Sequence, residues 1–306
     1  MSLVSQNKPT SLYTPRHWPT WIWIGLLRLI ALLPYGAQLK IGKALGVVLY
    51  HLARRRRHIT EVNLRLCFPE LDDKARDRMA REVFIHNAIG VMEAGMAWWA
   101  PKEWFRERTQ IKGREHLDAA LKQGCGVILL GAHFTTLDLG GVLLGFYYPF
   151  NTMYRRHNNP VLEEVIDKGR SRTSSTIERS NLRQVLRALR ANEIIWYAPD
   201  QDFGAHQSVY APFFGVQAAT ITATSRLVKL NQSPILMISQ HRLPDNRYEV
   251  EIYPIIKPFP TGDDVADATR INQEIERAIR KDPAQYMWVH RRFKTHPKGK
   301  NYLYRH

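Results

Sequence analysis

Short β-rich runs alternate with helical patterns along the last two thirds of the chain. These runs cover residues 126–131, 150–154, 194–198, 235–240 and 248–253. Helical patterns lie between and after them, over 160–170, 182–191, 219–230 and 264–280. Strands that alternate with helices form mostly parallel sheets with helices on their faces. The sequence therefore predicts an α/β fold with a mixed, largely parallel sheet flanked by helices.

The amino-terminal part has a different character. Residues 18–33 are rich in Trp, Ile and Leu, and residues 38–52 form a second apolar stretch that is followed by four arginines at 54–57. The first stretch is a little shorter than the roughly 20 residues that cross a bilayer. Indole rings favour the headgroup region, and a basic cluster beside an apolar segment attracts anionic lipid. We predict a membrane-anchoring helix and basic juxtamembrane segment over 1–57 and a separate domain over 58–306; a buried core helix is the alternative.

The chain is strongly basic, with a net charge of +16. Such a surplus favours an anionic partner, such as nucleic acid, acidic phospholipid, a phosphorylated substrate or an acidic carrier protein, although a generally basic surface would also account for it. No helix-turn-helix, zinc-finger or RNP motif supports nucleic acid. The two cysteines, Cys67 and Cys125, match no metal spacing and no disulfide framework, which favours a reducing compartment.

The strongest catalytic candidate is His133, five positions before Asp138, in an H-x4-D motif just after the apolar run 126–131. In one helix these side chains would diverge by about 140°. We therefore place His133 in a loop before a helix that begins near Thr135, with Thr135 or Thr136 as N-cap. There His133 would act as a general base that Asp138 orients. A loop histidine that caps a turn is the alternative.

Two arginines, Arg170 and Arg172, end the helical pattern at 160–170. A guanidinium binds phosphate or a developing oxyanion well. A solvated cation in the last turn of a helix is the alternative.

Carboxylates follow the strand-like run at 194–198. Asp200 and Asp202 could hold magnesium, but proton transfer from an alcohol to His133 needs no metal, and we predict none. We expect Asp200 to position a basic group or a substrate hydroxyl, and Asp202 and Gly204 to shape the turn. A purely structural turn is the alternative for both carboxylates.

The carboxyl-terminal arginines Arg291 and Arg292, with Lys294 beside them, extend the basic surface toward lipid phosphates or are ordinary solvated charges.

Distinctive sequence blocks follow one another over nearly the whole chain. They are TPRHWPTW, LPYG, NLRLCFPE, VMEAGMAWW, HFTTLDLGG, YRRHNNP, GRSRTS, WYAPDQDFG, APFFG and PAQYMWVHRRFKTHP. In this order the blocks resemble the lipid A late acyltransferases of Gram-negative bacteria, and the lauroyl and palmitoleoyl branch of that family more than the myristoyl one.

This resemblance implies a glycerol-phosphate-acyltransferase-like fold in an enzyme anchored in the inner membrane and facing the cytoplasm. Such an enzyme takes a fatty acyl chain from acyl carrier protein and, without a cofactor, esterifies the hydroxyl of a 3-hydroxyacyl chain on a Kdo-bearing lipid A precursor. The family usually has proline where this chain has Arg156. The resemblance implies His133, Asp138 and Arg170 as catalytic residues. The residues expected to bind substrate are Arg155, Asn158, Arg172, Asp200, Asp202, Arg291 and Arg292.

Other functions stay open at this stage. The acceptor could be another membrane glycolipid. A serine hydrolase would need a G-x-S-x-G elbow, and GRSRT is the nearest approach. A non-catalytic, basic protein that binds membrane or nucleic acid would leave the His133 and Arg170 motifs without a role.

Overall fold

A seven-stranded sheet lies at the centre of the protein, whose computed structural model describes residues 12–305. Its strand order is β1-β9-β8-β2-β5-β3-β4, and all neighbours are parallel except β8 and β9. A separate hairpin pairs β6 with β7. The strands are β1 (Thr109–Lys112), β2 (Val127–Leu130), β3 (Phe150–Tyr154), β4 (Ser175–Glu178), β5 (Ile194–Tyr197), β6 (Ser208–Phe213), β7 (Val216–Ile221), β8 (Ile235–Arg242) and β9 (Tyr248–Ile255). The predicted mixed, largely parallel sheet is confirmed.

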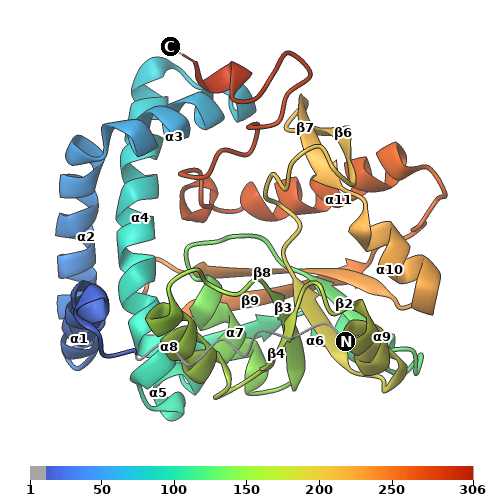
Figure 1. Cartoon of the computed structure of the whole chain (residues 1–306), viewed down its shortest axis with the longest axis horizontal. Helices are drawn as coiled ribbons and strands as arrows, with labels where there is room; N and C mark the ends of the chain where they lie inside the picture. Colours follow the sequence, from blue (N-terminus) through green and yellow to red (C-terminus); the bar gives the residue numbers. More distant parts are fainter. Residues whose placement is uncertain (1–11, 306) are drawn as a thin grey trace, which may run out of the picture.

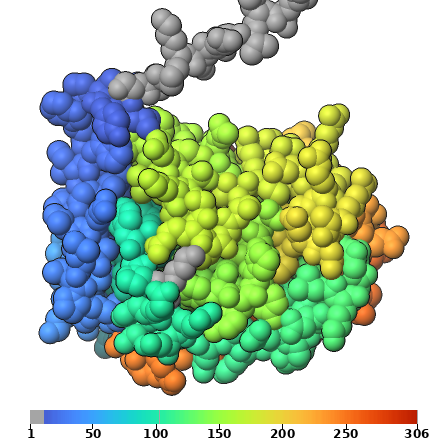
Figure 2. Space-filling view, turned by 90° about the horizontal axis from the view of Figure 1, so that it is seen from below, coloured from blue at the N-terminus to red at the C-terminus, as the bar shows by residue number. Residues whose placement is uncertain are grey.

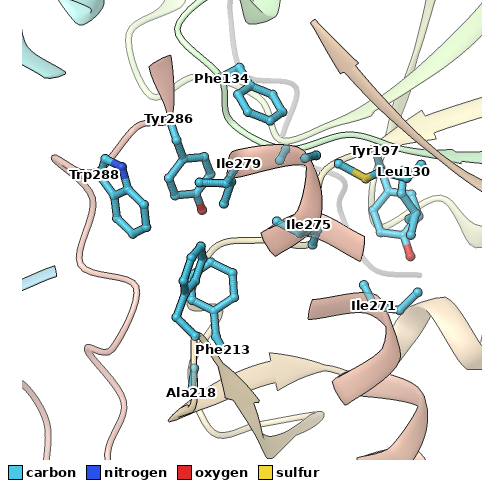
Figure 3. Close-up of a cluster of buried hydrophobic side chains, with 14 of the residues drawn as sticks. Leu130, Phe134, Tyr197, Phe213, Ala218, Ile271, Ile275, Ile279, Tyr286 and Trp288 are labelled. Atoms are coloured by element: carbon cyan, nitrogen blue, oxygen red, sulfur yellow. The ribbon is translucent and has the colours of Figure 1, made fainter. Parts of the chain in front are cut away.

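Helices cover both faces of this sheet (Figure 1). One face packs against α6 and α7 and the end of α4, and the other against α9, α10 and α11. Figure 3 shows part of the core between the sheet and α11, where Leu130 of β2 and Tyr197 of β5 face Ile271 and Ile275 of α11. These helices are α4 (Asp73–Trp99), α5 (Lys102–Arg106), α6 (Arg114–Leu121), α7 (Leu137–Gly145), α8 (Pro160–Arg170), α9 (Leu182–Arg190), α10 (Ala223–Asn231) and α11 (Asp264–Ile279).

Three further helices precede the sheet domain: α1 (Trp18–Ala31), α2 (Tyr35–Leu52) and α3 (Arg54–Cys67). Helix α2 packs closely against α4 at two glycines. A Cβ on Gly42 would lie 2.8 Å from Ile89, and a Cβ on Gly46 would lie 2.4 Å from Ile85. The arginine run that we expected to end the anchor forms the first turn of α3.

The structure contains no helix long and apolar enough to cross a membrane within residues 12–305. The anchor and the boundary after Arg57 therefore stay predictions, and residues 1–11 of that segment lie outside the described part of the chain.

The sequence pattern missed the short strands β1 and β4 and the hairpin β6–β7. Both edge strands have only four residues, and much of each is exposed, so neither forms a continuous apolar run. The helix expected from 219 begins at Ala223, because residues 216–221 form β7.

Candidate active site

His133 lies in the loop between β2 and α7, as predicted, and backbone contacts hold that loop on two sides. The carbonyl of His133 accepts a hydrogen bond from the Met287 amide at 3.0 Å, and the Thr135 amide donates to the Gln285 carbonyl at 2.8 Å. On the other side, helix α4 passes so close that a Cβ on Gly90 would lie 2.3 Å from the Thr135 carbonyl oxygen. The position of the imidazole is therefore fixed by the backbone around it.

The partner of the His133 ring is Asp200. Nδ1 of His133 lies 2.7 Å from Oδ1 of Asp200, and the His133 amide donates to Oδ2 at 2.9 Å. The Tyr286 hydroxyl also donates to Oδ2, at 2.9 Å. The strand register explains why these two side chains meet. Leu130 of β2 pairs with Tyr197 of β5, and His133 and Asp200 come three positions after Leu130 and Tyr197, respectively. The carboxyl ends of parallel strands thus bring an imidazole and a carboxylate together.

His133 and Asp200 shift the pKa of each other. Burial alone would raise the pKa of Asp200, but the charge and hydrogen bonds of His133 outweigh it and lower that pKa to about 2. Burial would lower the pKa of His133, yet the Asp200 carboxylate more than offsets this, so the imidazole pKa is raised. The His133 side chain remains 22% exposed, whereas that of Asp200 is fully buried. The imidazole is therefore both basic and accessible.

The expected pairing of His133 with Asp138 is wrong. Asp138 lies in the first turn of α7 and accepts from Nε and Nη2 of Arg170 at 2.9 and 2.8 Å. The carboxylate on the neighbouring strand end is better placed for Nδ1 than one that has already entered the helix. Thr136 is the N-cap of α7, but its hydroxyl donates to the Gln240 carbonyl rather than to the helix.

An apolar pocket opens beside the Asp138–Arg170 pair. Both side chains line it, together with Trp98, Val142, Leu144, Phe150, Trp196 and Ile238. Arg170 is the last residue of α8, and that helix meets α4 closely, since a Cβ on Gly169 would lie 2.3 Å from the Trp98 ring. The site therefore joins a basic imidazole, a partly exposed guanidinium and an apolar recess.

The other substrate-binding candidates are dispersed. Arg155 and Asn158 are exposed at the end of β3. The neighbouring Asn159 caps α8, and its amide donates to Thr20 of α1 at 2.9 Å. Arg172 donates to the carbonyls of Ala97 and Ala100 and so joins the end of α8 to the end of α4.

Asp202 and the carboxyl-terminal arginines fill structural positions. Asp202 accepts from the Gly204 amide at 2.9 Å and lies 3.7 Å from Lys294, which fits the expected turn. Arg291 donates to Asn301. Arg292 is only 2% exposed and donates to the Ala219 carbonyl at 2.8 Å. The prediction that Arg292 extends the basic surface is therefore wrong, because its guanidinium caps buried backbone instead.

Three residues that shape the site escaped the sequence analysis: Tyr286, Gln285 and Gly90. The first two lie in the PAQYMWVHRRFKTHP block, in which the sequence analysis assigned roles to the basic residues but none to Gln285 or Tyr286. Gly90 lies within a helix, where nothing in the local sequence signals a close backbone approach.

The comparison with known proteins fits this geometry. Residues 5–295 match the model of the bacterial lipid A biosynthesis acyltransferase family. The chain is 38% identical to the lipid A biosynthesis lauroyltransferase of Escherichia coli K12, over 95% of this chain and 96% of the relative. It is also 38% identical to the palmitoleoyltransferase of that strain, over 95% of both chains. Identity to the E. coli myristoyltransferase is 27%, over 93% of this chain and 90% of the relative.

The family match and the similarity to these relatives define an acyltransferase of lipid A biosynthesis. The chain belongs to the bacterial lipid A biosynthesis acyltransferase family.

Proposed function

We propose that this protein transfers a fatty acyl chain from acyl carrier protein to the hydroxyl of a 3-hydroxyacyl chain on a Kdo-bearing lipid A precursor, with His133 as the general base. The observation that carries the proposal is the 2.7 Å contact between His133 and Asp200. Arg170 and Asp138, which line the apolar pocket, are near enough to act on the His133 imidazole by their charge. Another membrane glycolipid with a free hydroxyl remains the alternative acceptor.

In this mechanism the Nδ1–H of neutral His133 donates to Asp200, which leaves the Nε2 lone pair to receive a proton. The acceptor hydroxyl gives that proton to Nε2 as its oxygen bonds to the thioester carbonyl carbon. The tetrahedral intermediate collapses and breaks the carbon–sulfur bond, and the imidazolium returns the proton to the departing thiolate. The buried, ionised Asp200 stabilises the imidazolium while it exists.

Arg170 is the group placed to stabilise the oxyanion of that intermediate. Its two hydrogen bonds to Asp138 fix the guanidinium plane at the pocket rim, where 24% of the side chain is exposed. Asp138 then acts through Arg170, as a positioning residue, rather than through His133. The apolar recess behind the pair suits the hydrocarbon tail of the acyl chain.

The proposed location is the inner membrane, with the site facing the cytoplasm. The sequence holds no Asp or Glu among its first 60 residues, although it holds nine Lys and Arg residues there. Helices α1 and α2 form one flank of the molecule, coloured blue in Figure 2. Their outer faces expose large apolar side chains at residues 18, 22, 23, 26, 29, 41, 45, 48, 49 and 52. An apolar face surrounded by cations favours a membrane with anionic lipid.

The test is transfer of a labelled acyl chain. Purified protein is incubated with acyl-carrier-protein thioester and a hydroxyacylated, Kdo-bearing lipid A precursor, beside a His133→Ala variant of equal thermal stability. We expect a new ester with the wild type and almost none with the variant. Equal product from both would remove His133 from the mechanism. Product formed only with a different glycolipid would show that this glycolipid, and not the lipid A precursor, is the acceptor.

A further inference from the structure

We propose that the exposed face of α9 and α10 is the docking surface for the acidic carrier protein that delivers the acyl chain. The inference rests on the carrier-dependent transfer proposed above and assigns that partner a place on the molecule.

The surface is built from five exposed cations. Helix α9 presents Arg183, Arg187 and Arg190, and the adjacent helix α10 presents Arg226 and Lys229. The spacing of three and four residues puts the α9 arginines on one side of the helix, while Val185, Ala188 and Leu189 pack into the core on the other. None of the five forms a salt bridge with a residue in the described part of the chain.

The sequence around this surface supplies almost no negative charge. From Arg179 to Pro244 the acidic residues are Glu193, Asp200 and Asp202, and the last two are 1% and 5% exposed. Basic residues therefore outnumber acidic ones in this stretch, so a positive field extends outward from this flank. Such a field steers an acidic partner into encounter and selects against basic ones.

The shape of the surface favours a folded protein over a bilayer. Helices α9 and α10 lie on the opposite flank from the apolar helices α1 and α2 (Figure 1). Large apolar side chains exposed there are few: Leu182, Leu230 and Phe203 at 45%, 54% and 39%. Isolated apolar residues among charges resemble a protein–protein interface, whereas an interfacial helix needs a continuous apolar face.

This surface is also connected to the site. Arg179, which precedes α9, has its guanidinium carbon 5.8 Å from the centre of the Phe203 ring. Phe203 belongs to the same loop as Asp200, and β5 runs directly from the end of α9 to that loop. A carrier held on α9 and α10 would lie beside the loop that holds the catalytic carboxylate. The lipid acceptor and the acyl donor could then approach from different flanks.

The test is a pair of charge-reversed double variants. Arg183→Glu with Arg187→Glu alters the proposed surface. Lys74→Glu with Arg78→Glu changes the net charge equally on exposed positions of α4. Each is assayed with the acyl-carrier-protein thioester and with the same acyl group on pantetheine, which lacks the acidic protein.

We expect the α9 variant to raise KM for the carrier thioester about tenfold at low salt, with kcat and the pantetheine KM unchanged. The α4 variant should match the wild type with both donors. An equal rise for both variants, or a rise with both donors, would overturn the assignment.

Direct binding separates this inference from the reaction. Fluorescence anisotropy of labelled carrier protein should show binding to the wild type that weakens about tenfold with the α9 variant and fades as salt rises. Unchanged binding by that variant would refute the docking surface, whatever the activity. Carrier binding without acyl transfer would refute the proposed reaction and leave the surface standing.

Discussion

The carboxylate of Asp200 contacts Nδ1 of His133 at 2.7 Å, although the two residues lie 67 positions apart. They meet because β2 and β5 are parallel neighbours with Leu130 opposite Tyr197. Asp138, only five residues from His133, instead binds Arg170. The contact therefore belongs to the sheet and not to the local motif.

The first prediction concerns the acid limb of the pH profile. A general base acts unprotonated, so activity falls as pH drops through its pKa. Burial lowers the pKa of His133 but Asp200 raises it above the usual value, so the limb should lie above the pH expected for a free imidazole. Asp200→Asn removes the carboxylate, so the limb should shift to lower pH while kcat falls. The measurement is kcat against pH for both proteins.

Asp202→Asn is a useful comparison for that shift, because Asp202 bonds to Gly204 rather than to His133. The acid limb of the Asp202→Asn profile should stay at the wild-type pH. An acid limb that is unmoved in Asp200→Asn would separate Asp200 from the titrating base.

The second prediction concerns Arg170. Arg170→Ala removes the guanidinium at the pocket rim and leaves Asp138 without its partner, so kcat should fall about 100- to 1000-fold. Arg170→Lys keeps the charge but loses the two-point geometry, so its kcat should lie between those of the wild type and the alanine variant. Steady-state kinetics with saturating donor measures both. Wild-type kcat in the alanine variant would exclude Arg170 from the transition state.

The third prediction tests the close approach of α4 to the catalytic loop. Gly90→Ala would place a methyl 2.3 Å from the Thr135 carbonyl oxygen, so the loop must move. We expect a loss of about 1–3 kcal/mol in the free energy of unfolding, together with lower activity. Gly25→Ala in α1 has nothing within 4 Å and should be neutral or stabilising by up to about 1 kcal/mol. Urea unfolding of the two variants gives the comparison, and equal stabilities would contradict it.

The fourth prediction concerns acyl-chain length. Gly141 lines the apolar pocket, and a Cβ there would meet only Phe150, at 3.8 Å. Gly141→Leu should fill the recess without straining the backbone and shift preference toward shorter chains. Competition between carrier thioesters of different length, with products resolved by mass spectrometry, measures this. An unchanged product distribution would place the acyl chain elsewhere.

The fifth prediction concerns the lipid-facing flank. Ile22→Asp with Val48→Asp puts two charges on exposed apolar positions of α1 and α2, which are 64% and 49% exposed. Flotation with vesicles that contain anionic phospholipid should decrease strongly. Val265→Asp, at a position 45% exposed on α11, should float like the wild type. Equal flotation of all three proteins would remove α1 and α2 from the membrane contact.

Local sequence determined much of this protein. Five β-rich runs marked β2, β3, β5, β8 and β9, because strands favour β-branched, aromatic and other large apolar side chains. Asp72 accepts from the Ala75 amide at 2.6 Å as the N-cap of α4, a role that depends on its local sequence position. The loop position of His133 is as predicted, although the pairing with Asp138 from which it was argued is wrong; the apolar run ends at Gly131, and His133 follows it directly. These features depend on a residue and its near neighbours alone.

Tertiary structure decided the rest. The sequence suggested Asp138 as the partner of His133 and linked Asp200 only to a basic group or a substrate hydroxyl. The order of the strands pairs His133 with Asp200 instead and leaves Asp138 to Arg170. Arg292 was expected at the surface, yet its guanidinium is buried, where it donates to the Ala219 carbonyl and the Thr220 hydroxyl. Sequence fixes which groups a strand or helix carries to its end. Which groups then meet depends on strand order and register, and these are set by packing between segments far apart in the chain.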